Sequence, residues 1–174
     1  VLGAGLAGAA TAASLARRGW EVTVLDAAAE PAAGASGLPA GLFCPHISPD
    51  DSVLSRLSRS GVRTTLQNLQ QLSQAQKLHP AQDWAHGGVL EHDLNEPSHL
   101  PRSWLQPGSE TSPWGLHWSA PALPAQLAAA KLPADSHAVW HEQAGWVRPA
   151  QLVRALLHQP RVLLMDEPLS NLDA

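Results

Sequence analysis

Three glycines near the N-terminus have the spacing of a phosphate-binding turn. Gly3, Gly5 and Gly8 form a GxGxxG run that follows two apolar residues and opens an Ala-rich helix. In such a run the first glycine permits a tight turn, the second lets the backbone approach a pyrophosphate, and the third lets helix and strand pack closely. The helix start, with Leu6 and Ala7, presents its partial positive charge to the phosphates. The run therefore predicts a dinucleotide site.

An acidic residue follows at the position that a bound ribose requires. Asp26 ends the apolar strand 22–25, about 20 residues beyond the glycines. Its carboxylate can accept hydrogen bonds from ribose hydroxyls. The glycine run alone is weak support, but the strand before it, the helix after it and the acid together meet the structural context of the motif. The alternative is a doubly wound domain whose Gly-rich turn holds no nucleotide.

The loop after Asp26 is rich in Gly, Ala, Ser and Pro, which leave the backbone free to lie against a ligand. Ser36 offers a hydroxyl, and Gly34 and Gly37 offer amides without bulk. Because the loop follows the strand of Asp26 directly, we expect it at the ligand-facing carboxyl edge of the sheet. An ordinary surface linker is the alternative.

The elements that must position these groups alternate between strand and helix at both ends of the chain. A second helix begins at Pro149 and stops at Pro160, and an apolar strand covers 161–166. We expect that strand in the same sheet as 22–25, because a buried parallel strand requires mainly apolar bulk. The fold class is therefore α/β, an incomplete Rossmann-like parallel sheet with an irregular α+β insert.

The insert opens with an amphipathic helix over residues 50–76, capped by Asp50 or Ser52. One stripe of apolar residues is expected to face the core: Leu54, Leu57, Val62, Leu66, Leu69 and Leu72. A group of arginines lies on another side, for which a solvated face is favoured over contact with RNA phosphates: Arg56, Arg59 and Arg63.

The rest of the insert predicts short elements only, because its prolines exclude a long helix. Strands are expected at 88–92 and 138–141, a short helix within 121–131, and a turn at Gly145-Trp146. Four tryptophans are expected to fill a core or a cleft wall: Trp84, Trp104, Trp114 and Trp118. The histidines between His79 and His117 have no compact metal-site spacing, so no metal is expected.

Composition bounds the class of protein. The chain has 174 residues, 44% of them hydrophobic, which suits one domain with a core and part of a second. Its net charge of −4 provides no basic stripe for nucleic acid. The single cysteine, Cys44, excludes an internal disulfide and fits a reducing cytosol. No apolar run is long enough for a membrane span, and we expect no signal peptide. Because the chain begins without Met and ends within a motif, we interpret it as a fragment.

Several segments resemble FAD-dependent oxidoreductases of the D-amino-acid oxidase superfamily. They are VLGAGLAGAATAASLARRGWEVTVLD, GASGLPAGLFCPHISPDD, LSRLSRSGVRTTL, DWAHGGVLEH and AGWVRPAQLVRALL, all within residues 1–158. The resemblance implies FAD as cofactor, with the three glycines at its pyrophosphate and Asp26 at its ribose. It also implies that the segment with Ser36 and Gly37 passes along the pyrophosphate and the ribityl chain. Many members carry Asn after that Ser-Gly, where this chain has Leu38-Pro39.

Within that superfamily the chain is similar to the FAD domain of a bifunctional tRNA-modifying enzyme of the cytoplasm. This similarity implies oxidation of a secondary amine, the removal of the carboxymethyl group from 5-carboxymethylaminomethyl-2-thiouridine, and tRNA as partner of the intact protein. In such proteins the Arg that holds the substrate lies in a C-terminal half outside this chain, so no catalytic residue is assigned. An FAD-dependent oxidase of small amines or amino acids is the first alternative.

The last residues, 159–174, resemble instead the Walker B strand and D-loop of ABC-transporter ATPases. Asp166 would stand beside Mg²⁺ and Glu167 would activate water. The chain has no GxxxxGK[ST] loop to hold the phosphates, so these carboxylates alone cannot assemble an ATP site. We therefore expect a composite of an oxidoreductase segment, 1–158, and an ATPase-like tail, 159–174. An ATP-binding transporter subunit and an inactive nucleotide-binding module are the remaining alternatives.

Overall fold

The computed structural model describes residues 1–92, 100–106 and 108–158 and the backbone of 161–164. The chain divides into two compact units. The first unit combines residues 1–41, 69–84 and 147 onward, and the second combines residues 42–68 and 85–146. The second unit therefore comes from the insert that separates the two βα portions of the first unit.

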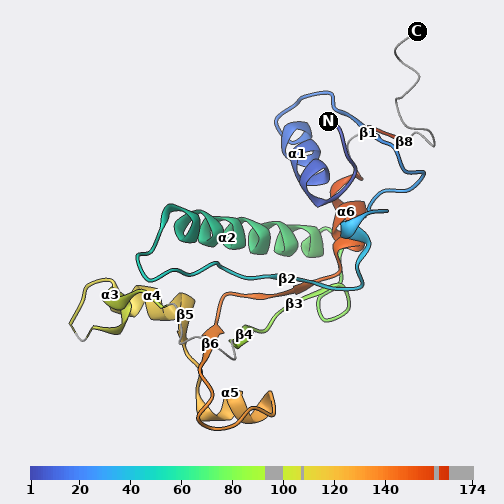
Figure 1. Ribbon diagram of the computed structural model, residues 1–174. Coiled ribbons are helices and arrows are strands. Elements are labelled where there is room, and N and C mark those ends of the chain that lie inside the picture. The colour runs from blue at the N-terminus through green and yellow to red at the C-terminus, as the bar shows by residue number, and fades with distance from the viewer. Residues whose placement is uncertain (93–99, 107, 159–160, 165–174) are drawn as a thin grey trace. The chain divides into compact units, whose positions relative to one another are not determined.

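Figure 1 labels the helices and strands of the two units. The first unit holds α1 (Leu6–Ala16), β1 (Thr23–Asp26), the 3-10 helix η1 (Ala35–Gly37), α6 (Pro149–Leu156) and β8 (Arg161–Leu164). The second unit holds β4 (Val89–His92), α3 (Arg102–Leu105), α4 (Ser112–Trp118), β5 (Ser119–Pro121), α5 (Pro124–Ala129) and β6 (Ala138–His141). The chain passes between the units in α2 (Val53–Gln74) and in the three-stranded sheet β2-β7-β3: β2 (Gly41–Phe43), β7 (Gly145–Val147) and β3 (Trp84–His86).

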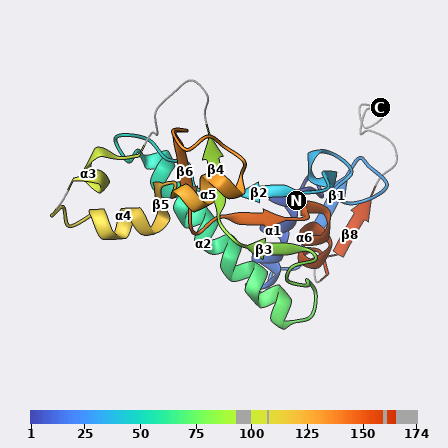
Figure 2. The same cartoon turned by 90° about the horizontal axis from the view of Figure 1, so that it is seen from below.

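The first unit contains the parallel sheet that the sequence predicts (Figure 2). Strands β1 and β8 pair in parallel from Thr23 opposite Arg161 to Asp26 opposite Leu164. The N-terminal segment bonds to the other edge of β1, where Leu25 N–H donates to Val1 O at 2.9 Å and Gly3 N–H donates to Leu25 O at 2.7 Å. The predicted pairing of the late strand with 22–25 is confirmed for 161–164; residues 165–166 lie outside the described residues.

Helices α1 and α6 pack together beside this sheet. The core of α1 consists of Ala9, Ala12 and Ala13, whose small side chains permit close approach. Helix α6 begins at Pro149 and buries Leu152 and Val153, as its apolar spacing predicts. The α/β class of the sequence prediction is thereby confirmed.

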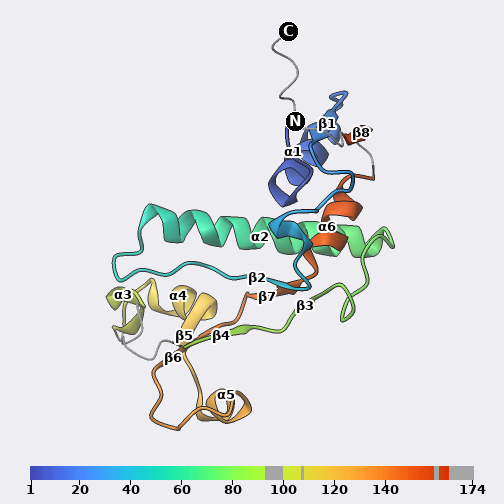
Figure 3. The ribbon, with the colours of Figure 1, turned by 45° about the vertical axis from the view of Figure 1, so that its right-hand side comes forward.

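The second unit is built on an antiparallel sheet of order β4-β6-β5 (Figure 3). His141 of β6 lies opposite Val89 of β4 on one side and opposite Ser119 of β5 on the other. The predicted strands at 88–92 and 138–141 are both confirmed, and α5 lies within the predicted 121–131.

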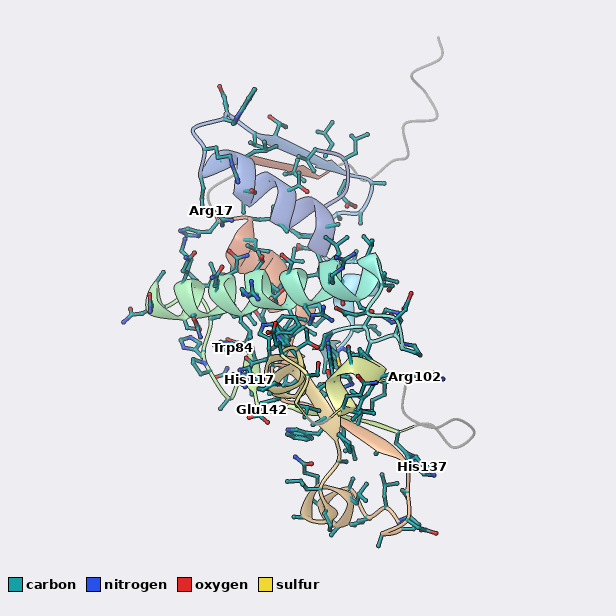
Figure 4. All side chains as sticks on the ribbon, turned by 90° about the vertical axis from the view of Figure 1, so that its left-hand side faces the viewer. Arg17, Trp84, Arg102, His117, His137 and Glu142 are labelled. Carbon is teal, nitrogen blue, oxygen red and sulfur yellow. The ribbon has the colours of Figure 1, made fainter. Side chains whose placement is uncertain are left out.

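The predicted turn at Gly145-Trp146 is wrong, because both residues belong to β7. The chain turns earlier, at Glu142 and Gln143. Glu142 is labelled in Figure 4. Gln143 donates from Nε2 to Nε2 of His117 at 2.9 Å, and His86 donates to the Glu142 carbonyl at 3.1 Å. Gly145 instead serves a close approach, since a Cβ there would lie 2.1 Å from the backbone oxygen of Ala85.

The long helix is confirmed as α2, with Ser52 as its cap: Ser55 N–H donates to Ser52 Oγ at 3.3 Å. Its buried face differs from the prediction at the N-terminal half, where Leu54 and Leu57 are 58% and 66% exposed. Ser55 and Arg59 are buried in their place, whereas Val62 is buried as predicted. Periodicity alone does not distinguish two adjacent stripes of the same helix.

Arg59 explains this choice of face, and its predicted solvation is wrong. The side chain is 3% exposed and forms an ion pair with Asp51, Nη1 to Oδ1 2.7 Å. Its guanidinium lies 5.2 Å from the ring of Trp104 and 5.0 Å from that of Trp114, which are themselves edge to face. A guanidinium gains both cation–π contacts and a carboxylate partner here, which offsets its loss of water.

We predict that Arg59→Ala lowers the free energy of unfolding by about 3–5 kcal/mol, because it leaves Asp51 unpaired and the two indoles without their cation. Urea denaturation measures the change. The matched control is Arg56→Ala on the exposed side of α2, which should stay within about 0.5 kcal/mol of the parent. Equal effects of the two substitutions would show that Arg59 is not a core residue.

His141 generates a pH prediction. Burial lowers its pKa below the ordinary value of 6.5, against the opposing effect of Glu91. As the pH falls through 6.5, the unfolded chain therefore binds a proton at His141 that the folded chain does not bind, and the free energy of unfolding decreases. The stability difference between the parent and His141→Gln should accordingly become less favourable to the parent from about pH 7.5 to about pH 5.5. A difference that is constant across this range, in urea denaturation, would contradict the burial of a neutral imidazole.

Candidate dinucleotide site

Two of the predicted glycines shape the turn between the N-terminal segment and α1. Gly3 has φ +94°, a conformation that favours glycine. Gly8 lies against it, because a Cβ on Gly8 would come within 1.8 Å of the Gly3 carbonyl oxygen. The turn and the first coil of α1 are thus in direct backbone contact, as the motif requires.

Asp26 holds this turn from the end of β1. Its Oδ2 accepts a hydrogen bond from Ala4 N–H at 2.5 Å, and its Oδ1 accepts one from Ala28 N–H at 2.8 Å. These bonds, the one from Ala4 foremost, hold the pKa of Asp26 below its ordinary value of 3.8. The carboxylate is therefore ionised at neutral pH, and each oxygen retains capacity for one further donor.

The loop after β1 is fastened to the same turn. Ala32 N–H donates to the Ala4 carbonyl at 3.1 Å, and Ser36 Oγ accepts from Leu6 N–H at 3.0 Å. Gly37 is required by close packing, since a Cβ there would lie 2.6 Å from the carbonyl oxygen of Ala32. Turn, strand end and loop are therefore one hydrogen-bonded assembly.

This assembly encloses a cavity of about 440 Å³. Only small residues and one carboxylate line it: Gly5, Asp26, Ala27, Ala28, Ala32, Ala33, Gly34, Ala35 and Ser36. Of the predicted site residues, the structure brings Gly5, Asp26 and Ser36 together in this lining. The other predicted residues do not line it: Gly3, Leu6, Ala7, Gly8 and Gly37. The alanines 27, 28, 32, 33 and 35 were not singled out; their small size around the motif was the available signal.

The cavity adjoins the N-terminus of α1, of which Gly5 is the cap. Among the described residues, none accepts a hydrogen bond from the N–H of Ala7 or Gly8. Free N–H groups and the helix dipole together attract an anion. With an ionised Asp26 in the same lining, the arrangement fits a diphosphate next to a hydroxyl-bearing sugar.

Within the described residues no group of three or more His, Cys, Asp or Glu side chains could hold a metal ion. Among the helices of these ranges, none is both long and apolar enough to cross a membrane.

Comparison with known proteins extends these observations beyond geometry. The family described as FAD dependent oxidoreductase (DAO) matches residues 1–163. This match runs into β8, and the predicted boundary between residues 158 and 159 stays a prediction.

Curated relatives and solved structures are consistent with the family. The chain is 64% identical over 162 residues to the tRNA 5-methylaminomethyl-2-thiouridine biosynthesis bifunctional protein MnmC of Delftia acidovorans, covering 93% of this chain and 24% of that protein. The MnmC protein of Paracidovorax citrulli is 57% identical with the same coverage. The chain thus spans about a quarter of the length of these relatives.

Glycine oxidase from Bacillus cereus shares the fold, with a TM-score of 0.63 at 20% identity, covering 94% of this chain and 44% of that one. Glycine oxidase from Geobacillus kaustophilus has a TM-score of 0.62 at 16% identity, covering 95% of this chain and 45% of that one. The fold, the glycine turn and the match over nearly the whole chain lead to one conclusion: the chain belongs to the FAD dependent oxidoreductase family, whose cofactor is FAD.

Proposed function

We propose that this chain is the part of a tRNA-modifying flavoenzyme that holds the ADP half of FAD. The observation that carries the proposal is the cavity of the first unit, where Gly5, Asp26 and Ser36 meet beside the start of α1. Its lining of Gly, Ala and Ser lets backbone N–H groups approach a ligand closely, and it offers no bulky side chain that FAD would have to displace.

Each predicted residue has a distinct part in this proposal. The N–H groups at the start of α1, near Ala7 and Gly8, face the diphosphate, and Gly5 gives it room. The ribose hydroxyls donate to the oxygens of Asp26, which Ala4 and Ala28 keep oriented. Ser36 occupies the N–H of Leu6, so it fixes the helix start. When bound, FAD supplies the oxidising group of the reaction.

The relatives support a specific reaction for the intact protein. The names of the MnmC proteins place them in tRNA 5-methylaminomethyl-2-thiouridine biosynthesis. We therefore propose that the intact protein oxidises a secondary amine on a modified uridine. A hydride would leave the methylene carbon of the carboxymethyl group for the oxidant that bound FAD supplies, and water would then hydrolyse the resulting imine, releasing the carboxymethyl group as glyoxylate. We further propose tRNA as partner, the cytoplasm as location, and catalytic groups outside this chain.

Two other functions would leave different signatures. An oxidase of small amines would bind FAD identically but would act on free amines and not on tRNA. The ATPase-like tail, whose residues 165–174 lie outside the described residues, predicts ATP hydrolysis if it belongs to an active site. We expect no hydrolysis, because the chain has no phosphate loop of the GxxxxGK[ST] type.

The first test of this proposal is FAD binding, followed by the quenching of flavin fluorescence. We predict that the chain binds FAD and that Gly5→Val weakens binding by about tenfold or more, because the side chain would project into the cavity that the diphosphate requires. The backbone of Gly5 is extended, with φ −84° and ψ −172°, a conformation that valine adopts. Its Cβ would lie 3.1 Å from Ser36 Oγ, so the Ser36 side chain would have to shift by a few tenths of an ångström.

The matched control is Gly61→Ala, at an exposed site on α2 where a Cβ would meet nothing within 4 Å. It should bind FAD as the parent does. A parent chain that leaves flavin fluorescence unchanged, or a Gly5→Val variant with undiminished affinity, would overturn the proposal.

A second prediction separates a glycine that shapes the turn, Gly8, from a glycine that lines the cavity, Gly34. Gly8→Ala should lower the free energy of unfolding by about 1–3 kcal/mol, because its Cβ would overlap the Gly3 carbonyl oxygen. Gly34→Ala should change stability little, since its Cβ would meet nothing within 4 Å. If thermal denaturation shows Gly8→Ala to be as stable as Gly34→Ala, the close contact of turn and helix is not required.

A further inference from the structure

The second unit contains a cavity of its own, of about 440 Å³. Apolar side chains provide most of its lining, together with one thiol, one imidazole and one carboxylate: Leu42, Cys44, Pro45, His46, Ile47, Val89, Leu90 and Glu91. The carboxylate belongs to Glu91, on β4. A negative charge beside apolar walls is unfavourable unless something compensates it, so its partners decide what the cavity can bind.

Glu91 is held by a row of hydrogen bonds that crosses the antiparallel sheet. Its Oε2 lies 2.8 Å from His141 Nε2 on β6, and His141 Nδ1 lies 2.8 Å from Ser119 Oγ on β5. Ser119 and His141 are both fully buried. A carboxylate only accepts, so Nε2 must donate to it, and the remaining nitrogen of a neutral imidazole accepts the Ser119 hydroxyl. The row thus fixes the position of the Glu91 carboxylate.

The row does not neutralise Glu91. Burial lowers the pKa of His141, so the imidazole is uncharged at neutral pH and donates a hydrogen bond without a positive charge. Among the described residues, the ion pairs place no Lys or Arg on Glu91. The carboxylate therefore has no Lys or Arg partner among the described residues, and about half of its side chain is exposed (55%).

The charge of Glu91 acts inside the cavity as well as at its rim. The pKa of the Cys44 thiol is raised to about 12, first by burial and then by the negative charge of Glu91. Cys44 is thus an uncharged thiol at neutral pH, and it adds no second negative charge. The three polar side chains of the lining are not arranged to hold a metal ion, since the described residues contain no such group.

We propose that this cavity binds an organic ammonium ion with an apolar substituent, with Glu91 as its counter-ion and His141 as the positioning residue. The apolar walls would take the substituent, and the carboxylate would accept the N–H groups of the cation. The site rests on the cavity and on this carboxylate, which has no Lys or Arg partner among the described residues, and it is independent of the proposed function.

Cys44 provides the test, because it is the chain's single cysteine and lines the cavity. The probe is N-methylbenzylamine, which is a secondary ammonium ion at neutral pH. The readout is the rate at which a maleimide alkylates Cys44 relative to the rate for glutathione in the same solution, followed by mass spectrometry, so that any maleimide consumed by the free amine cancels. We expect the amine to slow alkylation of the parent chain in a saturable way. Benzyl methyl ether, which has nearly the same shape and no charge, should need about fivefold or more higher concentration for equal protection.

Glu91→Gln removes the charge and keeps an oxygen that can accept from His141 Nε2. In this variant the amine should lose its advantage over the ether, and alkylation without ligand should become faster, because the negative charge next to the thiol is gone. The matched control is Glu30→Gln, an exposed residue of the first unit, which should behave as the parent does.

Equal protection by amine and ether in the parent, or no protection by either, would overturn the proposal; this comparison needs no variant. An unchanged preference for the amine in Glu91→Gln would overturn the role of Glu91. Because alkylation is followed without FAD, failure here leaves FAD binding in the first unit untouched, and failure of FAD binding leaves this result untouched.

Discussion

The hydrogen bonds from Ala4 and Ala28 to the carboxylate of Asp26 are the constraint on which the candidate site depends. They join the glycine turn to the end of β1, and the bond from Ala32 N–H to Ala4 O then fastens the following loop to the same turn. These bonds bring the turn, the end of β1 and the following loop together around one cavity. The two bonds to Asp26 have an ionised acceptor, so each is stronger than a bond between neutral groups. The residue that is expected to hold a ligand's ribose thus also assembles the site.

The sequence correctly predicted the elements whose residue pattern is compatible with only one type of secondary structure. The parallel pairing of β1 with β8 followed from two apolar strands joined to helices, and β6 was placed correctly at residues 138–141. The sequence did not show which of two adjacent stripes of α2 would be buried. Arg59 is buried in place of Leu57 because it pairs with Asp51 and with Trp104 and Trp114, and the two tryptophans are remote in the chain. Gly145 was misread for a similar reason: its glycine serves a close backbone approach and not a turn.

At the candidate site, the roles of Gly3 and Gly8 in the turn followed from spacing, because backbone sterics alone decide them. The alanines that line the cavity carried no individual signal, since an alanine is equally common in a core or a helix. The two units also use their carboxylates differently. Asp26 receives two backbone N–H groups, whereas Glu91 receives one neutral imidazole and retains its charge toward an apolar cavity. The first arrangement suits a neutral polyol beside an anion, and the second suits a cation.

The most direct test of the central claim is a titration of the ¹⁵N-labelled chain with ADP, followed by ¹H–¹⁵N correlation spectra. ADP carries the diphosphate and the ribose that the first cavity should hold, without the flavin ring. We expect shifts concentrated at the N–H groups of Gly5, Ala7, Gly8, Ala28 and Ser36, with residues of the β4-β6-β5 sheet unaffected. A spectrum that ADP leaves unchanged, or shifts centred on that antiparallel sheet, would contradict the assignment of the Asp26 cavity to the ADP half of FAD.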